Sequence, residues 1–89
     1  MLTMEDCIAL SDLTEDEIEA IAEHEHLPMM AAVEMGWYLV QTKEGEKRIK
    51  RMIADDIAHA QERGDHQHAA KLKLVLKQFL EEHGDIDKS

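Results

Sequence analysis

The chain has 89 residues, of which 44% are hydrophobic and 3% aromatic, and its 20 acidic and 10 basic side chains give a net charge of −10. A chain of this length has room for one domain, so we expect residues 1–89 to fold as a single unit. Because nucleic acids and anionic membrane surfaces repel an acidic protein on average, neither is expected as a partner.

The charge and the cysteine content indicate where the protein works. Residues 1–42 contain ten acidic side chains and no Lys or Arg, whereas residues 43–89 contain ten of each sign. The single cysteine, Cys7, cannot form an intramolecular disulfide, and the acidic N-terminus does not resemble a signal peptide. The longest apolar stretch, residues 27–40, is shorter than the roughly 20 residues that a membrane-spanning helix needs. We therefore expect a soluble, cytoplasmic protein.

The first half of the chain predicts two helices and a short turn. Thr3 with Asp6 can cap a short helical turn through residue 10. Thr14 with Glu17 is a capping box, which predicts a helix over residues 15–26. Pro28 fits the first turn of a helix and disfavours α geometry in the residue before it, so a new helix is expected over residues 28–42.

The second half predicts two longer helices. Gly45 is expected to end the preceding helix, and the next helix should cover residues 46–63 up to Gly64. Asp65 can cap a fourth helix over residues 66–83, with Gly84 as its end. Apolar residues recur at helical spacing in these segments, and none alternates with the period of a strand. The sequence therefore predicts an all-α fold, a small antiparallel bundle of four main helices with a short N-terminal helical turn.

The predicted helix over residues 28–42 is apolar on almost every side. A helix of this kind is either central in a core or shared with a partner, and three neighbours in a small monomer can hardly surround it. Leu74, in the last predicted helix, is a further apolar residue that falls outside the apolar face of its helix. We therefore predict a two-fold homodimer. Its expected interface residues are Met30, Met35, Trp37, Tyr38, Leu39 and Leu74.

Histidines and carboxylates gather at one end of the predicted bundle. Glu25 and Asp56 fall on the apolar faces of their helices, and burying a bare carboxylate is costly unless it is paired, protonated or bound to metal. The first functional hypothesis is thus a divalent metal such as iron or zinc, held by His24, Glu25, Asp56 and His59.

Two other interpretations use the same residues without a metal. In the simpler one, the histidines end helices or lie in solvent, and Glu25 and Asp56 pair with basic residues such as Arg63. In the other, titration of the histidines just below neutral pH tunes association with a partner.

No complete catalytic motif occurs in the chain, and Cys7 lies beside Glu5 and Asp6, which disfavours a reactive thiolate. We therefore expect no enzymatic activity and no cofactor. The favoured function is a small acidic module for protein–protein interaction or regulation, with a second copy or another protein as partner. The metal-binding bundle is the alternative.

Overall fold

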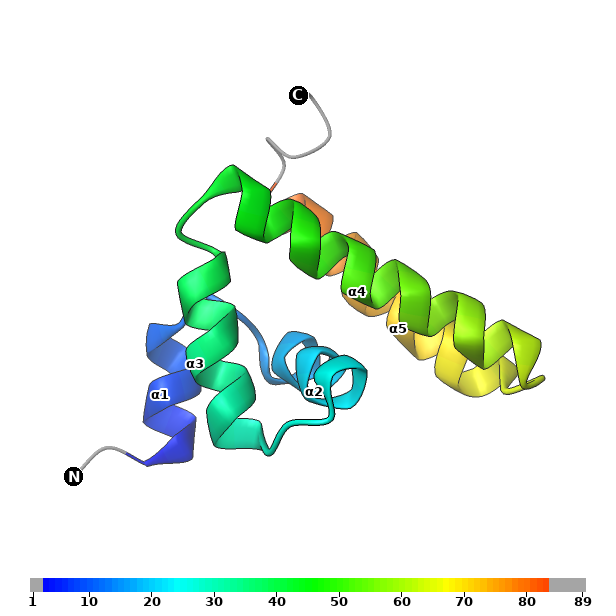
Figure 1. Cartoon of the computed structure of the whole chain (residues 1–89), viewed down its shortest axis with the longest axis horizontal. Helices are drawn as coiled ribbons and strands as arrows, with labels where there is room; N and C mark the ends of the chain where they lie inside the picture. The colour runs from blue at the N-terminus through cyan, green and yellow to red at the C-terminus, as the bar shows by residue number, and fades with distance from the viewer. Residues whose placement is uncertain (1–2, 84–89) are drawn as a thin grey trace.

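The computed structural model describes residues 3–83, and these form five helices and no strand. The helices are α1 (Met4–Leu10), α2 (Glu15–Glu25), α3 (Met29–Leu39), α4 (Lys43–Glu62) and α5 (His66–Glu82). The predicted all-α fold is confirmed (Figure 1). There are five helices rather than four because the predicted N-terminal turn is a helix of its own.

Local capping fixes the starts of the first two helices as predicted. In α1, the Thr3 hydroxyl accepts a hydrogen bond from the Asp6 backbone N–H at 3.1 Å, and Asp6 Oδ2 accepts one from the Thr3 N–H at 3.2 Å. The same reciprocal pair joins Thr14 and Glu17 at the start of α2, at 3.2 and 2.8 Å. Each box satisfies two backbone donors that a helix start otherwise leaves unpaired.

The boundary between α3 and α4 differs from the prediction. α3 ends at Leu39 and α4 begins at Lys43, so Gly45 lies inside the first turn of α4 instead of separating two helices. Thr42 caps α4, because its hydroxyl accepts a hydrogen bond from the Gly45 N–H at 3.0 Å. A glycine is required here for another reason: a Cβ on Gly45 would lie 1.8 Å from the carbonyl oxygen of Leu39.

The two longest helices, α4 and α5, lie side by side and antiparallel (Figure 1). The chain reverses at Gly64, which has a φ of +77°, a conformation that glycine adopts without steric cost. Asp65 then caps α5 by accepting a hydrogen bond from the His68 N–H at 3.2 Å. Gly84, predicted to end this helix, lies outside the described residues.

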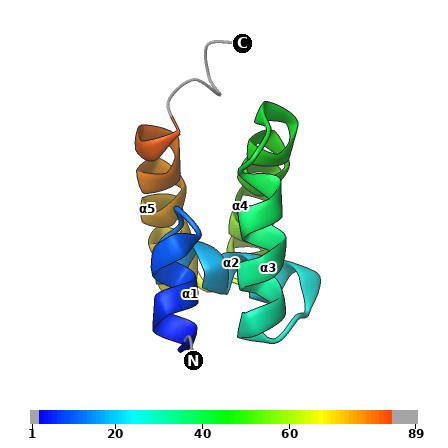
Figure 2. The same ribbon diagram turned by 90° about the vertical axis from the view of Figure 1, so that its left-hand side faces the viewer.

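The shorter helices pack against this pair. α2 runs crosswise between α3 on one side and the α4–α5 pair on the other, and α1 lies against α3 (Figures 1 and 2). α2 is therefore central, and its Ile18 and Ile21 are fully buried. With Ile49, Ile53 and Phe79, which are fully buried too, they form the middle of one hydrophobic core. Within residues 3–83, no helix combines the length and the hydropathy needed to cross a membrane.

Candidate functional site

The C-terminal end of α2 lies against α4 and the first turn of α5, and this contact gathers histidines and carboxylates. They line a cleft of about 200 Å³. His26, the residue that ends α2, is exposed in the left-handed conformation, with a φ of 56°. The lining residues are Glu23, His24 and His26 from the end of α2, and Asp56, His59 and Arg63 from the last turns of α4 and its C-cap.

His24 is held between two carboxylates. Its Nδ1 lies 2.8 Å from Glu25 Oε2, and its Nε2 lies 3.6 Å from Asp55 Oδ2. The other oxygen of Glu25 lies 3.8 Å from Arg48 Nη2, so Glu25 is half-buried and paired on both sides. Partial burial lowers the pKa of His24, but the hydrogen bond to Glu25 and the charges of Asp56 and Glu25, together with the contact to Asp55, outweigh it, and the pKa is raised above 6.5.

Asp56 is the buried acid of this cleft, as its position on the apolar face of α4 predicted. It is 7% exposed, and its Oδ2 has no hydrogen-bond partner among the described residues. Burial raises its pKa above 3.8, and the charge of Glu23 acts in the same direction, while His24 and His59 oppose the rise. Burial thus penalises the ionised form of Asp56 in the folded state.

Replacing Glu25 with glutamine tests this arrangement. The change removes the charged acceptor at His24 Nδ1, so we expect Glu25→Gln to lower the pKa of His24, as measured by NMR titration of the imidazole protons. Glu62→Gln is the matched control, because Glu62 is exposed on α4. An unchanged His24 titration in the E25Q variant would show that Glu25 does not hold the imidazole in solution.

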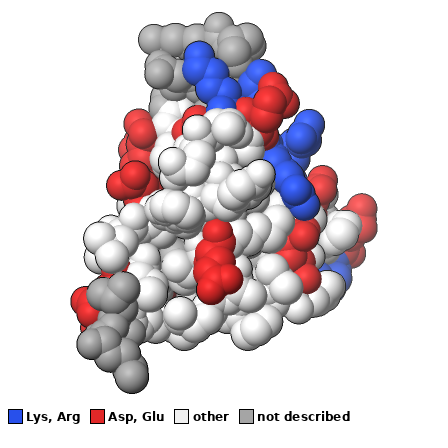
Figure 3. Space-filling model, turned by 60° about the vertical axis from the view of Figure 1, so that its left-hand side comes forward, with Lys and Arg blue, Asp and Glu red and all other residues white. Residues whose placement is uncertain are grey.

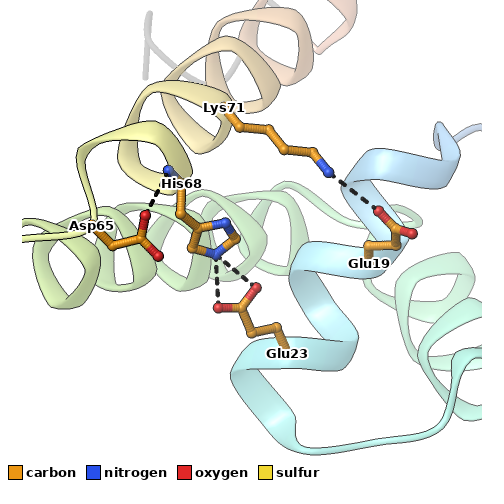
Figure 4. A network of polar contacts seen from close by, with 5 residues as sticks. All are labelled: Glu19, Glu23, Asp65, His68 and Lys71. Atoms are coloured by element: carbon orange, nitrogen blue, oxygen red, sulfur yellow. Dashed lines mark hydrogen bonds and ion pairs between the residues drawn. The ribbon is translucent and has the colours of Figure 1, made fainter. Parts of the chain in front are cut away.

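A second polar contact joins α2 to the start of α5 (Figure 4). His68 Nε2 lies 2.9 and 3.0 Å from the two carboxylate oxygens of Glu23, and Lys71 Nζ lies 3.7 Å from Glu19 Oε2. Asp65 fixes the same turn through the His68 backbone. His68 and Glu23 are thus a pair that ties two helices together, which agrees with the structural interpretation of this end.

The metal site predicted from the sequence is not assembled. Within residues 3–83, no three His, Cys, Asp or Glu side chains are grouped so that they could hold a metal ion, and His24, Glu25, Asp56 and His59 form no such set. The contacts show why: Glu25 and Asp55 lie against the two nitrogens of His24, and the second oxygen of Glu25 is paired with Arg48. The side chains converge in pairs rather than on one point.

The second feature is an apolar surface on α1 and α3, which we call the α1–α3 face. It contains a groove of about 500 Å³ lined by Cys7, Leu10, Val33, Glu34, Trp37 and Tyr38. Three of these side chains are widely exposed: Leu10 is 65%, Trp37 53% and Tyr38 74% exposed. Met4 and Met30, at 40% and 42%, add to the exposed apolar surface of the same two helices. Figure 3 shows this side of the molecule as a broad uncharged area with an acidic group in its middle.

The predicted interface residues divide into three groups. Met30, Trp37 and Tyr38 are exposed on α3, as an interface requires. Leu39 is instead 6% exposed and packs in the core, and Met35 is half-buried against it, because α2 and α4 cover that side of α3. Leu74 is 68% exposed, but it lies on α5 and not on the α1–α3 face.

A buried ionisable cluster at the opposite end was not predicted. Glu17 is fully buried, and its Oε2 has no hydrogen-bond partner among the described residues. Nearby, His83 Nδ1 lies 2.6 Å from Glu46 Oε2, while its Nε2 is buried and unpartnered there. The signal was present in the sequence, since Glu17 precedes Ile21 by four residues and so shares the apolar face of its helix.

The cleft at the end of α2 and the α1–α3 face suit different chemistry. The cleft at the end of α2 favours the protonated form of His24, because the hydrogen bond to Glu25 and the charge of Asp56 raise the pKa of this imidazole. The α1–α3 face can bury apolar side chains of a partner around aromatic anchors.

Leu10 and Cys7 were missed as parts of this face, because the docking of α1 on α3 is a tertiary contact with no local signal. No protein-family model, curated protein or solved structure matches this chain in the comparisons.

Proposed function

We propose that this protein is a small acidic interaction module without enzymatic activity, and that the α1–α3 face is its docking surface. The observation that carries the proposal is the exposure of Leu10, Trp37 and Tyr38 around one apolar groove. Tyr and Trp are the residues most often found to anchor protein interfaces. We further propose a cytoplasmic location, supported by the single, free cysteine.

Apolar exposure of this kind is costly for an isolated chain. Each Å² of apolar surface left in water forgoes about 25 cal/mol relative to burial. Single exposed apolar residues are ordinary, but several that line the same groove are typical of an interaction site. The groove lies between two helices, and a groove of this type accepts the apolar side of a further helix.

Self-association is the form of this function that the sequence predicts. We expect sedimentation velocity to show a dimer at concentrations of about 50 µM or above. We also expect dimerisation to strengthen with salt, because the α1–α3 face carries acidic charge that salt screens. Tyr38→Ala should weaken the dimer about tenfold, since it removes an exposed aromatic anchor at the groove.

Leu74→Ala is the matched control for the dimer. It removes a comparably exposed apolar side chain from α5, outside the α1–α3 face, and should leave the association unchanged. A protein that stays monomeric over this range contradicts the predicted homodimer. A dimer that only Leu74→Ala weakens would place the interface on α5 and contradict the α1–α3 face as the docking surface.

A further inference from the structure

The α1–α3 face has a charge pattern that selects among partners. Its groove is apolar except for one carboxylate, Glu34, which is exposed and makes no hydrogen bond or ion pair within residues 3–83. Asp6, four residues before Leu10, is a second exposed acid on α1, the helix that forms the other side of the groove. The first 42 residues contain no Lys or Arg that could neutralise either.

Glu34 is placed to act together with the two aromatic anchors. It precedes Trp37 by three residues and Tyr38 by four, and side chains at these spacings lie together on one face of a helix. All three line the groove. A cation bound by the carboxylate would therefore lie beside the indole and phenol rings, whose faces attract positive charge.

From this pattern we infer that the α1–α3 face binds an amphipathic helical segment whose apolar side fills the groove and whose Lys or Arg pairs with Glu34 between Trp37 and Tyr38. The inference rests on the proposed function and names the partner that suits it. The apolar lining requires a hydrophobic stripe, and the two-helix groove favours a helix. The unpaired acid favours a basic residue near that stripe.

A second copy of this chain meets these requirements less well. A two-fold interface places the same surface on both sides, so the acids on one α1–α3 face would approach those on the other. Like charges across an interface oppose association, whereas opposite charges favour it. The basic helix should therefore bind more tightly than a second copy, and its binding should weaken with salt while self-association strengthens.

Intrinsic fluorescence provides the test, because Trp37 is the only tryptophan of the chain and is 53% exposed. We would titrate the full-length protein with a synthetic peptide of about 18 residues, with leucines at helical spacing and Lys and Arg elsewhere. Two matched peptides serve for comparison: one with Glu in place of every Lys and Arg, and one with the basic sequence scrambled. We expect the basic amphipathic peptide to shift the Trp37 emission to the blue and to bind at least about tenfold more tightly than either comparison peptide.

Charge reversal at Glu34 localises the contact. Glu34→Lys should weaken binding of the basic peptide about tenfold or more, whereas Glu81→Lys should change it less than about twofold. Glu81 is an exposed acid on α5, so the control alters the net charge by the same amount away from the groove. Both variants should unfold in urea like the parent, because both side chains are exposed.

The outcomes separate this inference from the proposed function. Equal binding of the acidic and basic amphipathic peptides would overturn the basic partner while supporting the docking surface. Equal weakening by Glu34→Lys and Glu81→Lys, or equal binding of the scrambled peptide, would also overturn it, since binding would then follow net charge alone. If no peptide binds and the protein does not self-associate, the proposed function fails as well.

Discussion

Replacing Gly45 with alanine should destabilise the protein by about 3 kcal/mol, although the same change in an ordinary exposed helix stabilises by about 1 kcal/mol. The reversal comes from packing between the end of α3 and the start of α4. A Cβ at this position would lie 1.8 Å from the Leu39 carbonyl oxygen and 2.6 Å from its carbonyl carbon. Because these are backbone atoms, the two helices must separate to admit the methyl group.

Alanine at two other glycines is expected to cost less stability than alanine at Gly45. At Gly36 the added Cβ would meet the side-chain ends of Leu13 and Ile21, at 2.5 and 3.1 Å, which can shift more easily than backbone. At Gly64 it would meet nothing within 4 Å, and the cost is only that of a left-handed residue, about 1 kcal/mol. Urea unfolding should therefore show the largest loss for Gly45→Ala and the smallest for Gly64→Ala.

A small domain is stable by only about 5 kcal/mol, so the Gly45→Ala variant should have lost most of its margin. Gly36→Ala tests the assignment of the cause, since it adds the same methyl group to a helix. If Gly45→Ala unfolds at the same urea concentration as the parent, the close approach of Leu39 to α4 is not present in solution.

The helix starts could be predicted from the sequence because their causes are local. The Thr14–Glu17 capping box and the Asp65 cap each act over three or four residues, and both lie where they were expected. The role of Gly45 could not be predicted in the same way. Its position inside α4 depends on the carbonyl of Leu39, which approaches only when α3 and α4 turn against one another.

The candidate sites show the same difference between features with local causes, which the sequence predicts, and features that depend on tertiary contacts. The burial of Asp56 followed from helical periodicity, because a residue on an apolar stripe is buried whatever the neighbouring helix. Convergence of four ligands required the relative placement of two helices, and the crosswise path of α2 gave paired contacts instead. Trp37 and Tyr38 were predicted as interface residues from a surplus of apolar side chains, whereas the groove that they form with Leu10 depends on the docking of α1.

The second large effect is expected at Glu17, where a carboxylate is buried at the start of α2. Its Oε1 accepts a hydrogen bond from the Thr14 N–H at 2.8 Å, while its Oε2 is buried without a partner among the described residues. Burial raises its pKa above 4.5, and the charge of Glu82 adds to the rise, while the Thr14 hydrogen bonds and the charge of His83 oppose it. The ionised form is therefore penalised in the folded state.

We expect Glu17→Gln to stabilise the protein by about 1–2 kcal/mol at pH 7, because the buried side chain then carries no charge, and a buried charged group without a partner costs more than a neutral one. Glutamine keeps an oxygen for the Thr14 N–H, so the capping interaction survives. Glu15→Gln is the matched control: Glu15 is exposed in the same helical turn, and its loss removes only a favourable interaction with the helix dipole, worth a few tenths of a kcal/mol.

The pH dependence of the stability difference tests whether the charge of Glu17 is its cause. Because the folded state holds the proton of Glu17 more tightly than the unfolded chain, the parent protein gains stability relative to the E17Q variant as the pH falls from the folded-state pKa towards 4.5. The advantage of the variant should be larger at pH 7 than at pH 4, as urea unfolding at both values would measure. If the variant keeps its advantage in acid, the gain does not come from the charge of Glu17. If the variant is less stable than the parent at pH 7, His83 stabilises the carboxylate more than burial penalises it.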